Sequence, residues 1–128
     1  MNVVRKFAIQ MLLAMLYMKK LKIIHCDLKL ENILLDAENK SAIKIIDFGS
    51  SCFEKEKNFT YIQSRFYRAP EIIFGTSYNQ GIDMWSFGCI LFELYTGFPL
   101  FSSENEHDHI QCIMELRGYP PKSLLEVN

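Results

Sequence analysis

Apolar residues recur at helical spacing near the start of the chain. One face carries them at positions i, i+3 and i+4, namely Val4, Phe7, Ala8, Met11, Leu12, Met15 and Leu16. This spacing is typical of an amphipathic helix, and Lys19 and Lys20 would complement the dipole of its last turn. The apolar run at 7–18 is interrupted by Gln10 and is too short to span a bilayer. It predicts a core helix.

Shorter apolar runs follow this helix. Residues 22–24 read as an extended segment, and the runs at 32–35 and 42–46 flank the polar stretch 36–40. Two such runs joined by a short polar segment are typical of a β-hairpin. Residues 50–69 are polar and aromatic without a period, which predicts a long loop. Long loops inside compact domains are usually functional.

The second half of the chain predicts two more helices. Residues 82–95 are apolar on nearly every side, which is typical of a helix buried all round, and Gly97 is expected to cap its C-terminus. Ser103 followed by Glu106 matches a capping box that would begin another helix, with Gly118 at its end. The packing face of that last helix would consist of Ile110, Ile113 and Met114. Together these elements predict a mainly helical α+β fold.

Composition narrows the class of protein. The chain has 128 residues, 49% of them hydrophobic and 23% charged, which suits one domain with a single core. A net charge of −1 gives no electrostatic reason to expect nucleic acid or an anionic membrane as a partner. The four cysteines form no C-x-x-C pair, which argues against zinc and against a disulfide framework. We expect a reducing compartment, the cytoplasm or nucleus; the oligomeric state is left open.

Chemically versatile side chains gather at the two ends of the predicted hairpin. The loop before it reads His25-Cys26-Asp27-Leu28-Lys29-Leu30-Glu31-Asn32, and Asp47-Phe48-Gly49 follows it. The hairpin would bring two carboxylates, a lysine and a carboxamide to one place. That set can hold Mg²⁺ and a triphosphate beside a hydroxyl nucleophile.

These motifs resemble the catalytic loop H-x-D-x-K-x-x-N and the D-F-G of protein kinases. Ala69-Pro70-Glu71 resembles the A-P-E that closes the kinase activation segment, and residues 83–88 resemble the D-x-W-S-x-G that opens the buried central helix. The similarity extends over residues 3–121 and implies a partial protein-kinase-like fold, with 1–128 as the core of the C-lobe. The six glycines never form G-x-G-x-x-G, so the resemblance implies that the N-lobe is absent from this sequence.

Within that family the chain is most similar to the dual-specificity tyrosine-regulated kinases and their homeodomain-interacting relatives. The similarity rests on the H-C-D-L-K string, the I-D-F-G-S-S-C string and the Y-I-Q-S-R-F-Y-R-A-P-E string. The lysine two positions after the loop aspartate resembles serine/threonine-directed kinases. Two departures are visible: Leu30 stands where most of the family has proline, and residues 59–61 read Phe-Thr-Tyr where Tyr-Thr-Tyr is common.

The resemblance implies a role for each residue of the motifs. Asp27 would accept the proton of the substrate hydroxyl, and Lys29 would offset charge on the transferred phosphoryl group. Asn32 and Asp47 would ligate the Mg²⁺ that accompanies ATP. His25 would hold the loop by packing and hydrogen bonding, since Asp27 already supplies the base.

Two further expectations concern anchoring and regulation. Asp83 would bind backbone amides of the loop. Phosphorylated Tyr61 would carry a charge of about −1.5 to −2, and the nearest cations able to bind it bidentately are Arg65 and Arg68. Cys26, which stands where many kinases have an arginine, could not bind that phosphate.

Three functions remain open on these grounds. The favoured one is an ATP- and Mg²⁺-dependent serine/threonine or dual-specificity kinase acting on protein substrates, with negligible activity in the 128-residue chain alone. The second is a non-catalytic, kinase-derived binding or scaffold module that presents residues 50–68. A phosphotransferase for small molecules is the third, and the 61–71 segment, which suits peptide docking, disfavours it.

Overall fold

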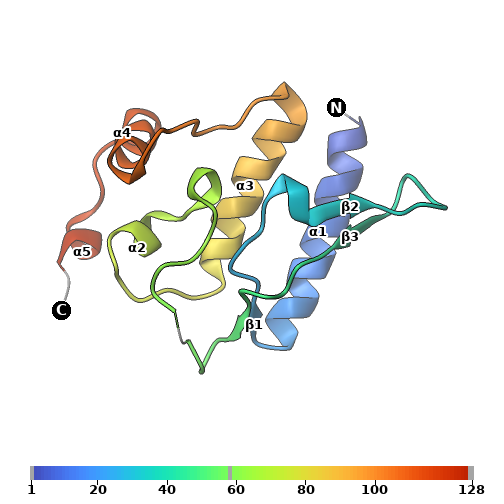
Figure 1. Cartoon of the computed structure of the whole chain (residues 1–128), viewed down its shortest axis with the longest axis horizontal. Coiled ribbons are helices and arrows are strands. Elements are labelled where there is room, and N and C mark those ends of the chain that lie inside the picture. Colours follow the sequence, from blue (N-terminus) through green and yellow to red (C-terminus); the bar gives the residue numbers. More distant parts are fainter. Residues whose placement is uncertain (1, 58, 127–128) are drawn as a thin grey trace.

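The structure is a computed structural model that describes residues 2–57 and 59–126. The helices are α1 (Asn2–Lys20), α2 (Pro70–Ile73), α3 (Gly81–Thr96), α4 (Glu106–Arg117) and α5 (Lys122–Leu125). The strands are β1 (Ile23–Ile24), β2 (Ile33–Leu35), β3 (Ile43–Ile45) and β4 (Cys52–Phe53), and the short 3₁₀ helices are η1 (Leu30–Asn32) and η2 (Arg65–Tyr67). Helices α1 and α3 pack together, β2 and β3 cross α1, and α4 and α5 lie on the other side of α3 (Figure 1). The predicted α+β, mainly helical fold is confirmed.

The predicted hairpin consists of β2 and β3. The strands pair antiparallel, with Ile33 opposite Ile45 and Leu35 opposite Ile43. The Asp36 carboxylate caps the turn by accepting hydrogen bonds from the amides of residues 38 and 39, each at 3.0 Å. Because each strand has only three residues, the side chains at the hairpin base stay close to the chain that enters and leaves it.

The predicted loop at 50–69 contains more structure than its pattern indicates, although residue 58 lies outside the described residues. It holds β4, whose Cys52 and Phe53 pair antiparallel with Ile24 and Ile23 of β1, and the 3₁₀ helix η2. A strand of two residues and a helix of three are too short to produce a detectable period. The small β1–β4 sheet nevertheless fixes where the loop starts.

The main core lies between α1 and α3. Its fully or almost fully buried members on these helices are Met11, Met15, Met18, Phe87, Cys89 and Ile90. The prediction that residues 82–95 are buried all round is wrong, because Met84 and Tyr95 are 49% and 64% exposed. On α1, Leu12 and Leu16 of the predicted face are likewise 42% and 50% exposed. Each helix covers only one side of the other, so its remaining apolar residues stay at the surface.

The ends of the long helices agree with the sequence except at one cap. Gly97 adopts a left-handed φ of 82° and its amide donates to the Glu93 carbonyl, as predicted for a C-cap. The predicted Ser103 capping box is wrong. The N-cap of α4 is Asn105, whose side chain accepts from the Asp108 amide at 2.9 Å, since Glu106 is already the first helical residue. Within residues 2–57 and 59–126, no helix is long and apolar enough to cross a membrane.

Candidate active site

The loop 25–32 is anchored from below by the first turn of α3. The carboxylate of Asp83, 3% exposed, accepts from the His25 amide at 2.8 Å and the Cys26 amide at 3.1 Å. Burial raises the pKa of Asp83, whereas these two N–H bonds act in the opposite direction. The predicted contacts of Asp83 are therefore present, and they fix the backbone just before Asp27.

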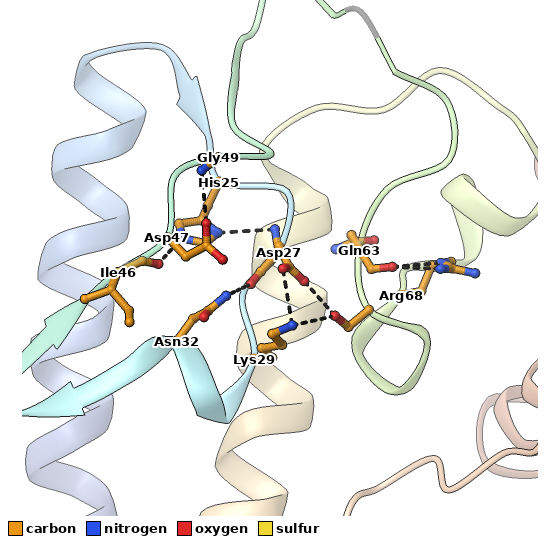
Figure 2. Close-up of polar contacts among 10 residues, drawn as sticks. His25, Asp27, Lys29, Asn32, Ile46, Asp47, Gly49, Gln63 and Arg68 are labelled. Atoms are coloured by element: carbon orange, nitrogen blue, oxygen red, sulfur yellow. Dashed lines mark hydrogen bonds and ion pairs between the residues drawn. The ribbon is translucent and has the colours of Figure 1, made fainter.

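His25 connects this loop to the strand that leads to Asp47. Its Nδ1 accepts from the Asp27 amide at 3.2 Å, and its Nε2 lies 3.0 Å from the Ile46 carbonyl (Figure 2). A carbonyl can only accept, so Nε2 carries the proton. The ring is fully buried and makes an edge-on contact with Phe48. Both ring nitrogens are thus used by the backbone, in agreement with the predicted structural role.

Asp27 lies in a compact polar triangle. Its Oδ1 accepts from the Ser64 hydroxyl at 2.7 Å, and its Oδ2 is 3.4 Å from the Lys29 ammonium, which also donates to Ser64 at 3.2 Å (Figure 2). The side chains of Asp27 and Lys29 are 16% and 28% exposed. Ser64 was not singled out in the sequence, where only its position in the S-R-F-Y-R string could have indicated it. The triangle fixes the orientation of the carboxylate while leaving it partly accessible.

Asn32 and Asp47 stand at the base of the hairpin. The Asn32 side-chain nitrogen donates to the Asp27 carbonyl at 2.9 Å, so the amide oxygen is the atom available to a ligand. The Ile46 amide donates to the Asn32 carbonyl at 2.9 Å, which places Asp47 immediately beyond this pairing. The Asp47 Oδ1 accepts from the Gly49 amide, where an added Cβ would stand only 3.1 Å from that oxygen. Glycine therefore permits this turn.

The oxygens of Asn32 and Asp47 fit a magnesium site. Mg²⁺ in nucleotide sites is usually bound by one or two carboxylates or amides, with phosphates and waters completing the octahedron. In the described part of the chain, no group of three or more His, Cys, Asp and Glu side chains could hold a metal by itself. An amide oxygen and a carboxylate oxygen are hard donors, the type that Mg²⁺ prefers.

Backbone strain concentrates around these residues. Among the described non-glycine residues, positive φ occurs at Lys22, Cys26, Asp47 and Gln63, and the last three have φ of 68°, 62° and 69°. Such conformations cost about 1–2 kcal/mol each and persist where the surroundings hold them. The Cys26 amide is held by Asp83 and the Gln63 amide donates to the Cys26 carbonyl at 3.0 Å. Two of the strained residues therefore support one another across the site.

A cavity of about 370 Å³ opens beside Asp27. Its wall consists of Asp27, Gly49, Ser50, Phe59 and residues 61–64. Asp27 thus borders an open space whose other wall includes residues 61–64, and the volume is large enough to admit an amino-acid side chain. The Cys26 thiol, whose pKa burial raises, lies 3.8 Å from the Cys52 sulfur on the far side of the loop.

Gln63 holds the segment 61–69 to the rest of the site, although no pattern in the sequence indicates this role. Its side-chain nitrogen donates to the Ile82 carbonyl at 2.9 Å and the Ser86 hydroxyl at 3.0 Å, and its side-chain oxygen accepts from the Ala69 amide at 2.8 Å. Only 7% of Gln63 is exposed. One amide side chain therefore joins both ends of the segment to α3.

Of the three residues predicted to act in regulation, the structure brings two together. The Arg68 guanidinium lies 4.3 Å from the ring centre of Tyr61, which is 73% exposed. Arg68 donates from Nε and Nη2 to the Gln63 carbonyl at 3.2 and 2.7 Å, while its buried Nη1 makes no hydrogen bond. The Glu106 carboxylate, 4.0 Å from Nη1, forms a loose ion pair but is too distant to accept a hydrogen bond from it. Arg65 lies over the Phe66 ring instead, and its buried Nε is also unpaired.

Comparison with known proteins identifies the family. Residues 1–124 match the family model described as the protein kinase domain. The chain belongs to the protein kinase family. Its loop 25–32, D-F-G turn and A-P-E segment are thus motifs of a kinase domain, and Asp27 and Gly49 of the first two line one cavity.

This kinase chain is similar to curated kinases of the dual-specificity tyrosine-regulated group. It is 62% identical over 125 residues to dual specificity tyrosine-phosphorylation-regulated kinase 3 of Rattus norvegicus, covering 98% of this chain and 21% of that protein. Over 126 residues it is 57% identical to the probable serine/threonine-protein kinase dyrk2 of Dictyostelium discoideum, covering 98% of this chain and 14% of the relative. The chain therefore spans about a fifth or less of these relatives, and the predicted subgroup is confirmed.

Leu30 stands where the resemblance in the sequence led us to expect proline. It begins η1 and packs against the core between α1 and α3. The loop thus keeps a helical turn between Lys29 and Asn32 without the rigid φ of a proline. An apolar contact holds the turn here.

Proposed function

We propose that this chain forms the core of the C-lobe of a protein serine/threonine or dual-specificity kinase, which transfers phosphate from ATP to hydroxyl groups of protein substrates. The observation that carries the proposal is the Asp27 carboxylate, oriented by Ser64 and Lys29 at the edge of an open cavity. The family membership and the relatives support the same reaction. Because the chain covers only part of the relatives, the activity is proposed for the whole protein that contains it.

In this proposal Asp27 orients the substrate hydroxyl and receives its proton. The Ser64 hydrogen bond to Oδ1 fixes the carboxylate of Asp27, whose Oδ2 lies beside the Lys29 ammonium. Lys29 offsets negative charge that gathers on the phosphoryl group during transfer. General-base assistance of this kind contributes roughly 10²–10⁴-fold to a rate.

ATP would supply the phosphoryl group, and Mg²⁺ would neutralise its charge. Asn32 through its amide oxygen and Asp47 through its carboxylate would hold the metal. The backbone bonds of both side chains support this assignment, since they fix each residue and leave oxygen atoms for a ligand. His25 and Asp83 take no part in the chemistry and keep these residues in register.

Activation would involve phosphorylation of Tyr61. Its exposure makes the hydroxyl accessible to a kinase, and Arg68 already lies over its ring with one nitrogen, Nη1, that makes no hydrogen bond. A phosphate there would bring a charge of about −1.5 to −2 and would satisfy Arg68 Nη1, with Arg65 as a second donor. Tyr61→Phe in the full-length protein should lower kcat/KM for a protein substrate about tenfold and leave the thermal midpoint unchanged. Equal activity of the two proteins would remove this part of the proposal.

The isolated 128-residue chain should have negligible kinase activity. Phosphoryl transfer depends on positioning and electrostatics, and this sequence contains no glycine-rich G-x-G-x-x-G loop to cover the nucleotide phosphates. Incubating the purified chain with ATP, Mg²⁺ and a generic basic protein tests the statement. Turnover comparable to that of the full-length protein would contradict it.

The reaction itself is tested by Asp27→Asn in the full-length gene product that contains this chain. Asparagine keeps the shape and can still accept from Ser64, but it cannot take a proton, so kcat should fall by roughly 10²–10⁴-fold. Asp36→Asn in the hairpin turn is a matched control with full activity expected. An active Asp27→Asn protein would contradict the assigned base. A wild-type protein that transfers no phosphate but binds proteins through residues 50–68 would favour the scaffold function.

A further inference from the structure

A buried histidine of α4 contacts the backbone of the segment 61–69. His109 is fully buried, and its Nε2 lies 3.2 Å from the carbonyl of Arg68. Its Nδ1 lies 3.2 Å from the hydroxyl of Ser103, which is 3% exposed. No motif of the sequence indicates His109, and Ser103 was predicted only as a helix cap. The hydrogen bonds of the two residues lie away from Asp27 and the hairpin base.

The two contacts define the tautomer and the protonation state of the His109 ring. The Arg68 carbonyl can only accept, so Nε2 must carry a proton, and a neutral ring then accepts at Nδ1 from the Ser103 hydroxyl. Burial lowers the pKa of His109, and the nearby Arg68 and Arg65 cations act in the same direction, while the bond to the carbonyl opposes them. At neutral pH the ring is therefore a neutral donor, with its orientation fixed by Ser103.

The carbonyl that His109 binds belongs to the residue that organises the segment. The Arg68 guanidinium donates to the carbonyls of Ile62 and Gln63 at 3.1 Å or less from its nearest nitrogens. Ser64 follows Gln63 in the chain, and its hydroxyl donates to the Asp27 carboxylate at 2.7 Å. Hydrogen bonds and the peptide link between Gln63 and Ser64 thus connect α4 through Arg68 to the aspartate. Figure 2 shows the bonds between Arg68 and Gln63.

We propose that His109, oriented by Ser103, is a positioning residue for the protein substrate. It fixes the main chain of Arg68, which keeps the guanidinium on the Gln63 carbonyl and the cavity wall at 61–64 in its binding shape. The inference rests on the proposed kinase function, because the cavity wall that His109 would hold in place is the one proposed to bind the protein substrate.

If His109 only filled space in the core, its position would require a side chain of similar size but no hydrogen-bond donor. The ring does pack edge-on against Phe101, with centroids 5.6 Å apart, and an apolar residue of similar size could make that contact. It could not donate to the Arg68 carbonyl. Glutamine, in contrast, can place an amide N–H near the position of Nε2 while lacking the aromatic ring. The two substitutions therefore separate the donor from the packing surface.

The experiment compares His109→Leu, His109→Gln and the control His107→Leu in the full-length gene product. His107 lies on the same helix and is exposed. With a protein or peptide acceptor, His109→Leu should raise the KM for that acceptor about tenfold, with the KM for ATP unchanged. The acceptor KM of His109→Gln should stay within about twofold of the wild-type value. The acceptor KM of Ser103→Ala should lie between those of His109→Gln and His109→Leu. The control should match wild type.

Two results would overturn the inference while leaving the kinase function intact. One is an acceptor KM that His109→Leu does not change in an active enzyme; the other is a His109→Gln protein as impaired as His109→Leu, which would show that only the ring shape matters. If part of the His109→Leu protein misfolds, kcat falls as well, and an unchanged acceptor KM of the folded fraction overturns the inference in the same way.

A measurement that does not require kinase activity tests the inference independently of the proposed function. Hydrogen exchange of the Gln63 and Ala69 amides, both bonded within the site, should accelerate about tenfold in His109→Leu and not in His107→Leu. Nitrogen chemical shifts should show the Nε2-protonated form of His109 at neutral pH. Unchanged exchange or the Nδ1-protonated form would overturn the inference even in a protein without kinase activity.

Discussion

The loop 25–32 and the segment 61–69 face the same cavity but are held by different means. The loop is held chiefly from outside, because two of its main-chain amides donate to the carboxylate of Asp83 on α3; its own His25 ring adds a bond to the Ile46 carbonyl. The segment is fixed mainly by long side chains, with Gln63 reaching α3 and Arg68 reaching back to residues 62–63. The chemistry therefore has a rigid support of its own, while the cavity wall depends on a few side chains that can be changed separately.

The largest effect is expected from removing the anchor of the loop. Asp83→Ala would leave two buried amides without acceptors, which costs about 3 kcal/mol of unfolding free energy. It would also release the backbone before Asp27, so activity of the full-length protein should be abolished for every acceptor. Urea unfolding and phosphate transfer measure the two effects. Asp108→Ala on α4 is the control, and equal losses in both variants would contradict a special role of Asp83.

A smaller and more selective effect is expected from the segment. Gln63→Leu removes the bonds to Ile82 and Ser86 and frees the Ala69 amide, at a cost of about 2 kcal/mol. Because Asp83 still holds the loop, the KM for ATP should stay the same while that for a protein acceptor rises. Steady-state kinetics with each substrate varied in turn measures the difference. Parallel changes in both constants would show that the two regions are not separately supported.

The smallest effect is expected at the hairpin turn, far from both regions. Hydrogen bonds from the amides of Asn39 and Glu38, together with Lys44, lower the pKa of Asp36 to about 2. A lowered pKa stabilises the fold above the usual pKa near 3.8, and the gain is lost as pH falls from about 4 towards 2. Asp36→Asn should therefore lower the thermal midpoint slightly at neutral pH, and the difference should vanish in acid. A difference independent of pH would contradict this origin.

The two regions also differ in how well the sequence predicts them. The hairpin and the positions of Asp27, Lys29, Asn32 and Asp47 near its base follow from spacing along the chain. The bonds of Asp83, which is 58 positions from His25, were expected only from the resemblance to kinase motifs. The contacts of the segment 61–69 could not be predicted in this way. Gln63 reaches Ile82, and His109 reaches Arg68 from 41 positions away, and such pairs leave no local pattern.

The errors in the helices have a physical cause as well. Periodicity shows that α1 and α3 can bury their apolar faces, but it does not show which neighbours are present to cover them. Leu12, Leu16 and Met84 accordingly lie at the surface of this chain. The Ser103 error arose because a serine three positions before a glutamate fits a helix start, although its hydroxyl is used by His109.

The left-handed backbone at Cys26, Asp47 and Gln63 restricts which amino acids these three positions can accept. Valine, isoleucine and threonine carry a branched Cβ that clashes in this conformation. Random mutagenesis of the gene should therefore recover few functional variants with these residues there, even where side-chain size alone would be tolerated. Main-chain conformation, in addition to side-chain chemistry, therefore limits which substitutions can accumulate around this site during evolution.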